Sequence, residues 1–177
     1  MIAFVLGGGK AVWEDLEAAR QLGQADMIVA CNHAGRDAPF HVDHWASMHP
    51  DLFPKWVAER RAAGRPDAGK LWGARHRQHR AAIACEPIES WGGSSGLLCV
   101  TVALQLGCTH IILCGVPMHQ NAAHYDRVDK KWIEARQYWG SWERWLPQMH
   151  GKVKSFSGQT FHWLGSPTRE WLNAEQG

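Results

Sequence analysis

The chain has 177 residues, of which 45% are hydrophobic and 20% charged. This composition is typical of a soluble globular protein, and the length predicts a single domain over residues 1–177 with a sizeable core. The formal net charge of +2 is too small to indicate nucleic-acid binding, and the basic run Arg75–Arg80 is more typical of a solvated loop.

The five cysteines are scattered, odd in number and mostly in apolar surroundings. None has the spacing of a metal site, so we expect reduced, buried thiols in a cytoplasmic protein. No charged region precedes a long apolar stretch, and no run is long enough to span a bilayer. A disulfide-stabilised secreted domain and an integral membrane protein are therefore not expected.

The chain begins with a predicted strand over residues 2–6, a glycine turn and a helix that ends before Gly23. This order is typical of a βα unit that binds a nucleotide at its turn, formed here by Gly7, Gly8 and Gly9. The match to G-x-G-x-x-G is incomplete because Val12 stands at the third glycine, and no P-loop motif is present. Lys10 could neutralise a phosphate there or be an ordinary solvated lysine.

Two further predicted strands end in polar residues. Residues 27–31 are followed by Asn32 and His33, and residues 45–48 are followed by His49. Ligands bind at the carboxyl ends of parallel strands, so Asn32 could hydrogen-bond a base or ribose, or simply form a turn. The histidines around His49 lack the one-turn helical spacing of a zinc motif, so no metal site is predicted.

The middle of the chain is predicted to hold a glycine-rich turn, a buried helix and a buried strand. Residues 51–63 are predicted to be helical, residues 64–80 a loop or weak edge strand, and residues 81–85 a strand. Residues 97–106 are apolar on nearly every side, and residues 111–114 form an unbroken apolar run typical of a central parallel strand. Gly107 would end the helix in the left-handed conformation.

The turn before this helix is the strongest candidate for an anion site. Free N–H groups at a helix N-terminus attract anions, and glycines let the backbone approach a ligand closely. Ser94 or Ser95 could cap the helix, with Gly93 and Gly96 beside them. The alternative is an ordinary loop that leads into a core helix.

The last third is predicted to contain a polar loop, a long helix, a strand and a final helix. The loop over residues 116–125 carries His119, His124 and Tyr125 just past the central strand. Residues 126–146 are predicted to be helical, residues 152–156 a strand, and Ser166 with Pro167 would open the final helix. The tryptophans of the long helix are spaced as core or dimer contacts, so this helix could join two copies of the chain.

Short apolar strands that alternate with helices predict an α/β fold with three layers, Rossmann-like, around a mainly parallel central sheet. The polar residues at the strand ends would then share one edge of the sheet. That agreement favours the anion site over the ordinary loop.

The span from Gly93 to Gly107, with the strand ending in Gly115 and the loop to Tyr125, resembles the bacterial sialyltransferases of glycosyltransferase family 42. It also resembles the related 6-hydroxymethylpterin pyrophosphokinase-like proteins. These families share a serine- or threonine-glycine turn, a helix ending in Leu-Gly, a strand ending in glycine and a polar loop with tyrosines. The N-terminal glycines and Cys31-Asn32-His33 match the first two ligand loops of these families in order.

The resemblance implies roles for individual residues. Asn32 and Gly7 to Gly9 would hold a cytidine nucleotide, and Ser94 or Ser95 would lie beside the donor. Tyr125 would stabilise the leaving phosphate, with His119 in place of a second tyrosine. His124 is our choice among three candidate histidines for the general base, because imidazole titrates near neutral pH.

The sequence also departs from these families. Lys10 replaces an asparagine of the first loop, and Val116 and Pro117 follow Gly115 where an acidic residue is usual. The chain is also short, with little room for a lid over an acceptor.

The leading hypothesis is therefore a nucleotide-binding transferase that moves a group from a nucleotide-activated donor. It requires no cofactor beyond this donor, although magnesium could accompany the nucleotide. A non-catalytic nucleotide-binding module is the alternative. A pyrophosphokinase-like phosphotransferase ranks third because it would need magnesium, which carboxylates usually hold. A partner-binding protein with the tryptophan-rich helix as its interface ranks fourth.

Overall fold

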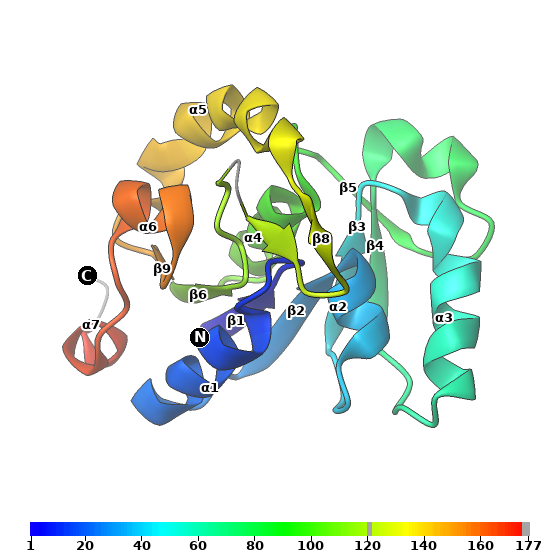
Figure 1. Ribbon diagram of the computed structural model, residues 1–177, viewed down its shortest axis with the longest axis horizontal. Helices are drawn as coiled ribbons and strands as arrows, with labels where there is room; N and C mark the ends of the chain where they lie inside the picture. Colours follow the sequence, from blue (N-terminus) through cyan, green and yellow to red (C-terminus); the bar gives the residue numbers. More distant parts are fainter. Residues whose placement is uncertain (120–121, 175–177) are drawn as a thin grey trace.

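The computed structural model describes residues 1–119 and 122–174, with the backbone alone for residues 128–130. A seven-stranded sheet forms the middle layer (Figure 1), and every pairing in it is parallel. Its strands, in spatial order, are β5 (Glu86–Ile88), β4 (Lys70–Ala74), β3 (His44–Ser47), β2 (Met27–Cys31), β1 (Ile2–Leu6), β6 (His110–Cys114) and β9 (Val153–Ser155). The predicted three-layer, Rossmann-like α/β fold is confirmed.

Helices cover both faces of the sheet. Each central strand alternates its side chains between the two faces, as in β1, where Ala3 and Val5 belong to one core cluster and Phe4 and Leu6 to the other. The α-helices are α1 (Val12–Leu22), α2 (Asn32–Asp37), α3 (Phe53–Ala62), α4 (Ser95–Gln105), α5 (Trp139–Met149), α6 (Gly158–Leu164) and α7 (Arg169–Asn173). Helices α4, α5 and α6 pack on one face, and α1, α2, α3 and α7 pack on the other. No helix in the described ranges has the length and apolar character that a membrane span requires.

The strand order creates one point where the chain changes direction. From β1 the strands add outward to β5, and α4 then returns the chain across the sheet to β6 on the other side of β1. Helix α1, which follows β1, packs on one face of the sheet, and α5, the next α-helix after β6, packs on the other. In open α/β sheets, ligands bind in the crevice that opens at such a point.

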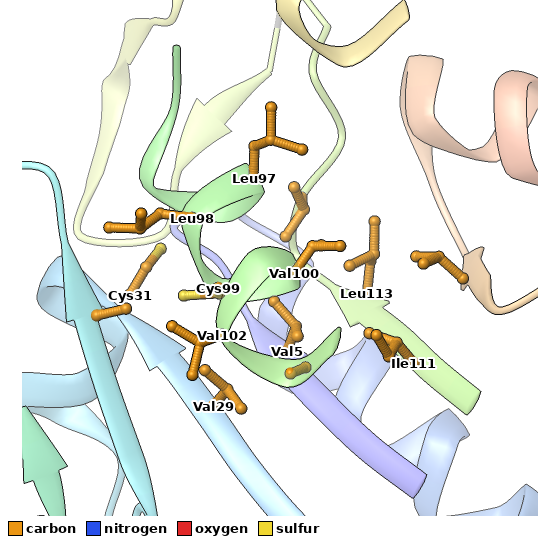
Figure 2. Packing of buried hydrophobic residues seen from close by; sticks show 14 of the residues in the cluster. Val5, Val29, Cys31, Leu97, Leu98, Cys99, Val100, Val102, Ile111 and Leu113 are labelled. Carbon is orange, nitrogen blue, oxygen red and sulfur yellow. The ribbon is translucent and has the colours of Figure 1, made fainter. Parts of the chain in front are cut away.

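Helix α4 is the buried centre of one face. Its residues from Ser95 to Ala103 are all buried, and the helix packs on β1, β2 and β3. Ile111 and Leu113 of β6 belong to the same hydrophobic cluster (Figure 2). The Ser94 hydroxyl accepts a hydrogen bond from the Leu97 N–H at 3.4 Å, so Ser94 is the cap that the sequence left open between two serines. Gly107 has a φ of +85°, as predicted for the residue that ends this helix.

Residues 64–88 differ from the prediction. Strand β4 is interior, because β3 and β5 flank it, and is not a loop or weak edge strand. Residues 81–85 are not a strand, and the edge strand β5 follows at Glu86–Ile88. The basic run forms a 3-10 helix, η2 (Arg75–Arg80). The apolar residues 81–85 lie in a connection, where a short apolar run resembles a strand in sequence.

The predicted helix over residues 126–146 is wrong for residues 126–138 and confirmed for residues 139–146. Residues 123–131 form a hairpin of β7 (Ala123–His124) and β8 (Arg127–Lys131), followed by the 3-10 helix η3 (Ile133–Tyr138). Helix α5 begins only at Trp139. Trp142 of α5 is fully buried, and its indole N–H donates to Ser94 Oγ at 3.1 Å. This tryptophan therefore belongs to the core, and association through α5 stays a prediction.

The C-terminal part contains one helix that the sequence did not predict. Helix α6 starts at Gly158, which has a φ of +68°. The α6 residue Thr160 donates from its hydroxyl to the Val116 carbonyl at 2.6 Å, so α6 holds the loop after β6. Thr168, and not Ser166, caps the final helix α7.

Asp15 of α1 ties three elements together. The residue is only 8% exposed, and its carboxylate accepts from the Gly115 N–H at 2.9 Å and from the Ser157 hydroxyl at 3.4 Å. It thus satisfies a buried backbone donor at the end of β6.

We expect Asp15→Ala to lower the free energy of unfolding by about 1–3 kcal/mol, because the buried Gly115 N–H loses its acceptor. Asp15→Asn should keep most of the stability, because a carboxamide oxygen still accepts this hydrogen bond. Urea unfolding of both variants tests this. Equal losses in the two variants would contradict the role of the hydrogen bond.

The buried carboxyl group of Asp15 also predicts that the stability of the protein depends on pH. Burial raises the pKa of Asp15, although the hydrogen bond from Gly115 acts in the opposite direction. The raised pKa favours folding below the ordinary pKa, and this contribution is lost as pH rises through the folded value. The stability of Asp15→Asn relative to the unmodified chain should therefore increase between about pH 3 and pH 7. A constant difference over this range in urea unfolding would contradict the shift.

Candidate functional site

A cavity of about 340 Å³ opens at the carboxyl edge of the sheet. The loops after β1, β2, β3 and β6, the start of α4 and the β7–β8 hairpin surround it. It brings together many residues that the sequence singled out: Gly7, Gly8, Gly9, Asn32, His33, His49, Ser94, Ser95, Gly96 and His124.

The glycine loop after β1 packs first against the chain itself. The Gly7 N–H donates to Cys114 and the Gly9 N–H donates to Gly115, both at 2.8 Å. A Cβ on Gly7 would lie 2.2 Å from the Gly115 carbonyl oxygen. A Cβ on Gly8 would instead lie 2.9 Å from Nδ1 of His124 in the hairpin. Backbone packing thus requires Gly7, whereas Gly8 determines the space around a cavity side chain.

Asn32 holds an unusual backbone conformation at the cavity wall. Its φ is +46°, in the left-handed region that non-glycine residues seldom adopt. Its carbonyl accepts from the Trp45 indole at 2.9 Å, and its Oδ1 accepts from the Ser47 hydroxyl at 2.8 Å. Within the described ranges nothing accepts from its amide nitrogen, so this donor remains available to a ligand. Strained backbone of this kind clusters at functional sites.

The start of α4 supplies further donors. The first N–H groups of a helix lack intrahelical partners, and here they include those of Ser95 and Gly96, which line the cavity. Ser95 Oγ accepts from the Met48 N–H at 3.2 Å and so links α4 to the end of β3. The helix dipole adds partial positive charge at the same place. This end of the cavity suits an anionic group.

Two cavity histidines lie in surroundings that favour the neutral ring. Burial lowers the pKa of His49, and the nearby Arg77 lowers it further. Arg77 donates to His49 Nδ1 at 3.2 Å, and because a guanidinium group cannot accept, the proton of the neutral ring lies on Nε2. Burial and Arg127 lower the pKa of His124 in the same way.

His33 differs from the other two because it contacts a carboxylate. Its Nδ1 lies 2.5 Å from Oδ2 of Asp126, which is at the turn of the β7–β8 hairpin. Asp126 itself does not line the cavity.

Tyr125 lies outside the cavity lining. Its hydroxyl donates to Asp37 Oδ2 at 2.8 Å, and its ring packs edge-on against Trp13 at 5.6 Å. Burial, with Asp37 nearby, raises the pKa of this phenol. The hydroxyl is therefore engaged with α2 and not with the space where a leaving phosphate would lie.

Three other predicted residues do not line the cavity. Lys10 is exposed, and its backbone N–H donates to the Ala123 carbonyl at 2.9 Å. Gly93 has a φ of +73° in the turn before α4 and faces Tyr138. His119 is exposed and adjoins residues 120–121, which lie outside the described ranges.

Sequence reasoning missed part of the cavity wall. Arg127 and Trp132 come from the hairpin region that was predicted to be helical, and Leu52 and Trp56 come from the segment after β3. No local pattern indicated them, because their role depends on how the hairpin folds back over the glycine loop. Arg127 adds a cation to a wall that is otherwise apolar.

The side chains that line the cavity are neutral or positively charged. Its polar side chains are the Asn32 amide, the Ser94 and Ser95 hydroxyls, three imidazoles and the Arg127 guanidinium, and no aspartate or glutamate among the described residues lines it. No group of three or more metal-ligating side chains occurs in the described part of the chain. The cavity therefore favours a negatively charged ligand.

Fold and cavity together define a class: a Rossmann-like α/β protein with an anion-suited cavity where the strand order reverses. The solved structures that resemble it include the sialyltransferase CST-II in complex with a trisaccharide acceptor and CMP, with a TM-score of 0.59 and 12% identity. They also include the sialyltransferase CstII from Campylobacter jejuni in complex with the substrate analogue CMP-3FNeuAc, with a TM-score of 0.64 and 11% identity. Each match covers 99% of this chain and 89% of the other.

At such identities the similarity shows the fold alone. No protein-family model matches the chain, and no curated protein matches its sequence.

The two glycines yield a matched prediction. Gly7→Ala should lower the free energy of unfolding by about 1–3 kcal/mol, because its Cβ meets backbone that cannot move aside. Gly8→Ala should cost less than about 1 kcal/mol, because only the His124 ring must move, but it should change the environment of that ring. Urea unfolding and the imidazole NMR signals of His124 test the pair. Unchanged His124 signals in Gly8→Ala would contradict the contact.

Proposed function

We propose that this chain binds a nucleotide-activated donor in the cavity and transfers the activated group, as a glycosyltransferase-like enzyme. The observation that supports this proposal most strongly is that Asn32, the glycine loop and the start of α4 meet around one cavity. No carboxylate among the described residues lines this cavity. The sialyltransferase fold, seen elsewhere with CMP and a CMP-linked analogue, supports this reading.

The phosphate of the donor would lie at the start of α4. The N–H groups of Ser95 and Gly96 would donate to its oxygens, as helix N-termini do in phosphate sites. Arg127 and the neutral His49, with its proton on Nε2, provide further donors on the cavity wall. These groups would stabilise the charge that develops on the phosphate as it leaves.

The nucleoside would lie toward Asn32. The amide nitrogen of Asn32 can donate to a base or ribose, while the contacts of its carbonyl and Oδ1 hold the residue in place. The ring of Trp56 lines the same side of the cavity and offers an apolar surface.

A non-catalytic nucleotide-binding module is the second candidate. The observation that favours it is the position of Tyr125, whose hydroxyl is bound to Asp37 outside the cavity. A phosphotransferase is disfavoured, because the described lining offers no carboxylate for magnesium.

We expect CMP, UMP or one of their sugar conjugates to raise the melting temperature of the protein, with or without magnesium. At a hundred times its dissociation constant a ligand stabilises the fold by about 2.7 kcal/mol. Asn32→Ala removes the amide donor, and Ser95→Ala removes the hydroxyl that joins the start of α4 to Met48 and so holds the two N–H donors in place. Each change should weaken binding at least about tenfold by calorimetry, which corresponds to about 1.4 kcal/mol.

The matched controls are Asn173→Ala and Ser166→Ala, which change exposed residues outside the cavity lining. They should leave the dissociation constant unchanged. If no nucleotide binds the unmodified chain, the proposed function is wrong. If binding occurs and no donor is consumed with any acceptor, the non-catalytic module is the correct alternative.

A further inference from the structure

Among the three histidines that line the cavity, His33 is the one whose ring contacts a carboxylate. It lies in the first turn of α2, directly after Asn32, and its side chain is 25% exposed. Its Nδ1 lies 2.5 Å from Oδ2 of Asp126. The ring also packs edge-on against Trp56, with 5.5 Å between the ring centroids. A hydrogen bond and an aromatic contact thus fix the ring.

The carboxylate of Asp126 is itself held in place. Its side chain is 15% exposed, although it belongs to a hairpin turn. Nη2 of Arg36 lies 3.8 Å from its Oδ2, and Nε of Arg127 lies 3.7 Å from its Oδ1. Arg36 is anchored in turn by Asp37 and Glu59. The carboxylate is therefore flanked by two guanidinium groups and directed at the imidazole.

The tautomer of His33 follows from this contact. A carboxylate only accepts, so the Nδ1 of a neutral His33 must carry the proton. The other nitrogen, Nε2, then has a free lone pair that can accept a proton. His49 has the opposite tautomer because Arg77 donates to its Nδ1. In the neutral form, His33 can therefore accept a proton at Nε2, whereas His49 can donate a hydrogen bond from Nε2.

We propose that His33 is the general base of the transfer reaction and that Asp126 is the positioning residue that fixes its tautomer. This inference rests on the proposed function and assigns His33 the role that sequence reasoning gave to His124. The acceptor hydroxyl oxygen forms a bond to the anomeric carbon of the donated sugar. The bond from that carbon to the phosphate oxygen breaks, and its electron pair leaves with the nucleotide. The hydroxyl proton passes to Nε2 of His33.

The dyad can be tested without any activity. In long-range ¹H–¹⁵N spectra of the unmodified chain, neutral His33 should show the proton on Nδ1. Asp126→Asn should lose this preference, and Asp67→Asn, which changes an exposed carboxylate paired with Arg61, should keep it. A proton on Nε2 of His33 in the unmodified chain would overturn the proposal.

The catalytic role is tested with the CMP- or UMP-sugar that binds in calorimetry. His33→Ala should lower kcat for donor consumption by about 10²–10⁴-fold, the usual contribution of general acid–base catalysis, while the dissociation constant of the nucleotide stays within about twofold. Asp126→Asn should lower kcat in the same direction, and Asp67→Asn should not.

The outcomes separate the two proposals. If the nucleotide binds and His33→Ala retains full kcat, the general-base role is wrong and the nucleotide site stands. If His33→Ala weakens nucleotide binding at unchanged kcat, His33 is a binding residue and the proposal is overturned. If no nucleotide binds, the proposed function and the role of His33 both fail.

Discussion

The site depends on the close approach of the chain after β1 and after β6. The Gly7 and Gly9 N–H groups donate to the Cys114 and Gly115 carbonyls at 2.8 Å, which continues the strand pairing past the sheet edge. A side chain at Gly7 would overlap the Gly115 oxygen. These hydrogen bonds join the loop after β1 to the loop after β6. The cavity at the reversal of strand order therefore lies over the two loops and does not separate them.

The parts of this arrangement with a strong local signal could be predicted from the sequence. Strands β1, β2 and β6 are unbroken apolar runs, because both of their faces are covered. Helix α4 was visible for the same reason, since it is buried on every side. The glycine turn at Gly7 to Gly9 and the expected helix cap at Ser94 or Ser95 located two of the loops that line the cavity. The polar ends of these strands then followed from the rule that parallel strands present their carboxyl ends at one edge.

The parts that depend on distant contacts could not be predicted. Strand β4 carries Lys70 beside the buried Trp72, so its pattern resembles that of a loop until β3 and β5 pair with it. The tryptophans near helical spacing favoured one long helix. The chain instead folds Trp132 over the cavity as part of the region after β8 and buries Trp142 against Ser94. Long-range packing, and not the local spacing of the tryptophans, therefore determines where the helix begins.

The position of Tyr125 explains how the hairpin contributes to the site. The Tyr125 hydroxyl binds Asp37 at the end of α2, and the next residue, Asp126, contacts His33 at the start of the same helix. Two adjacent hairpin residues therefore hold both ends of α2. The tyrosine that the family resemblance assigned to the leaving phosphate acts in this structure as an anchor. That anchor places a carboxylate behind His33, across 93 positions of sequence that share no local pattern.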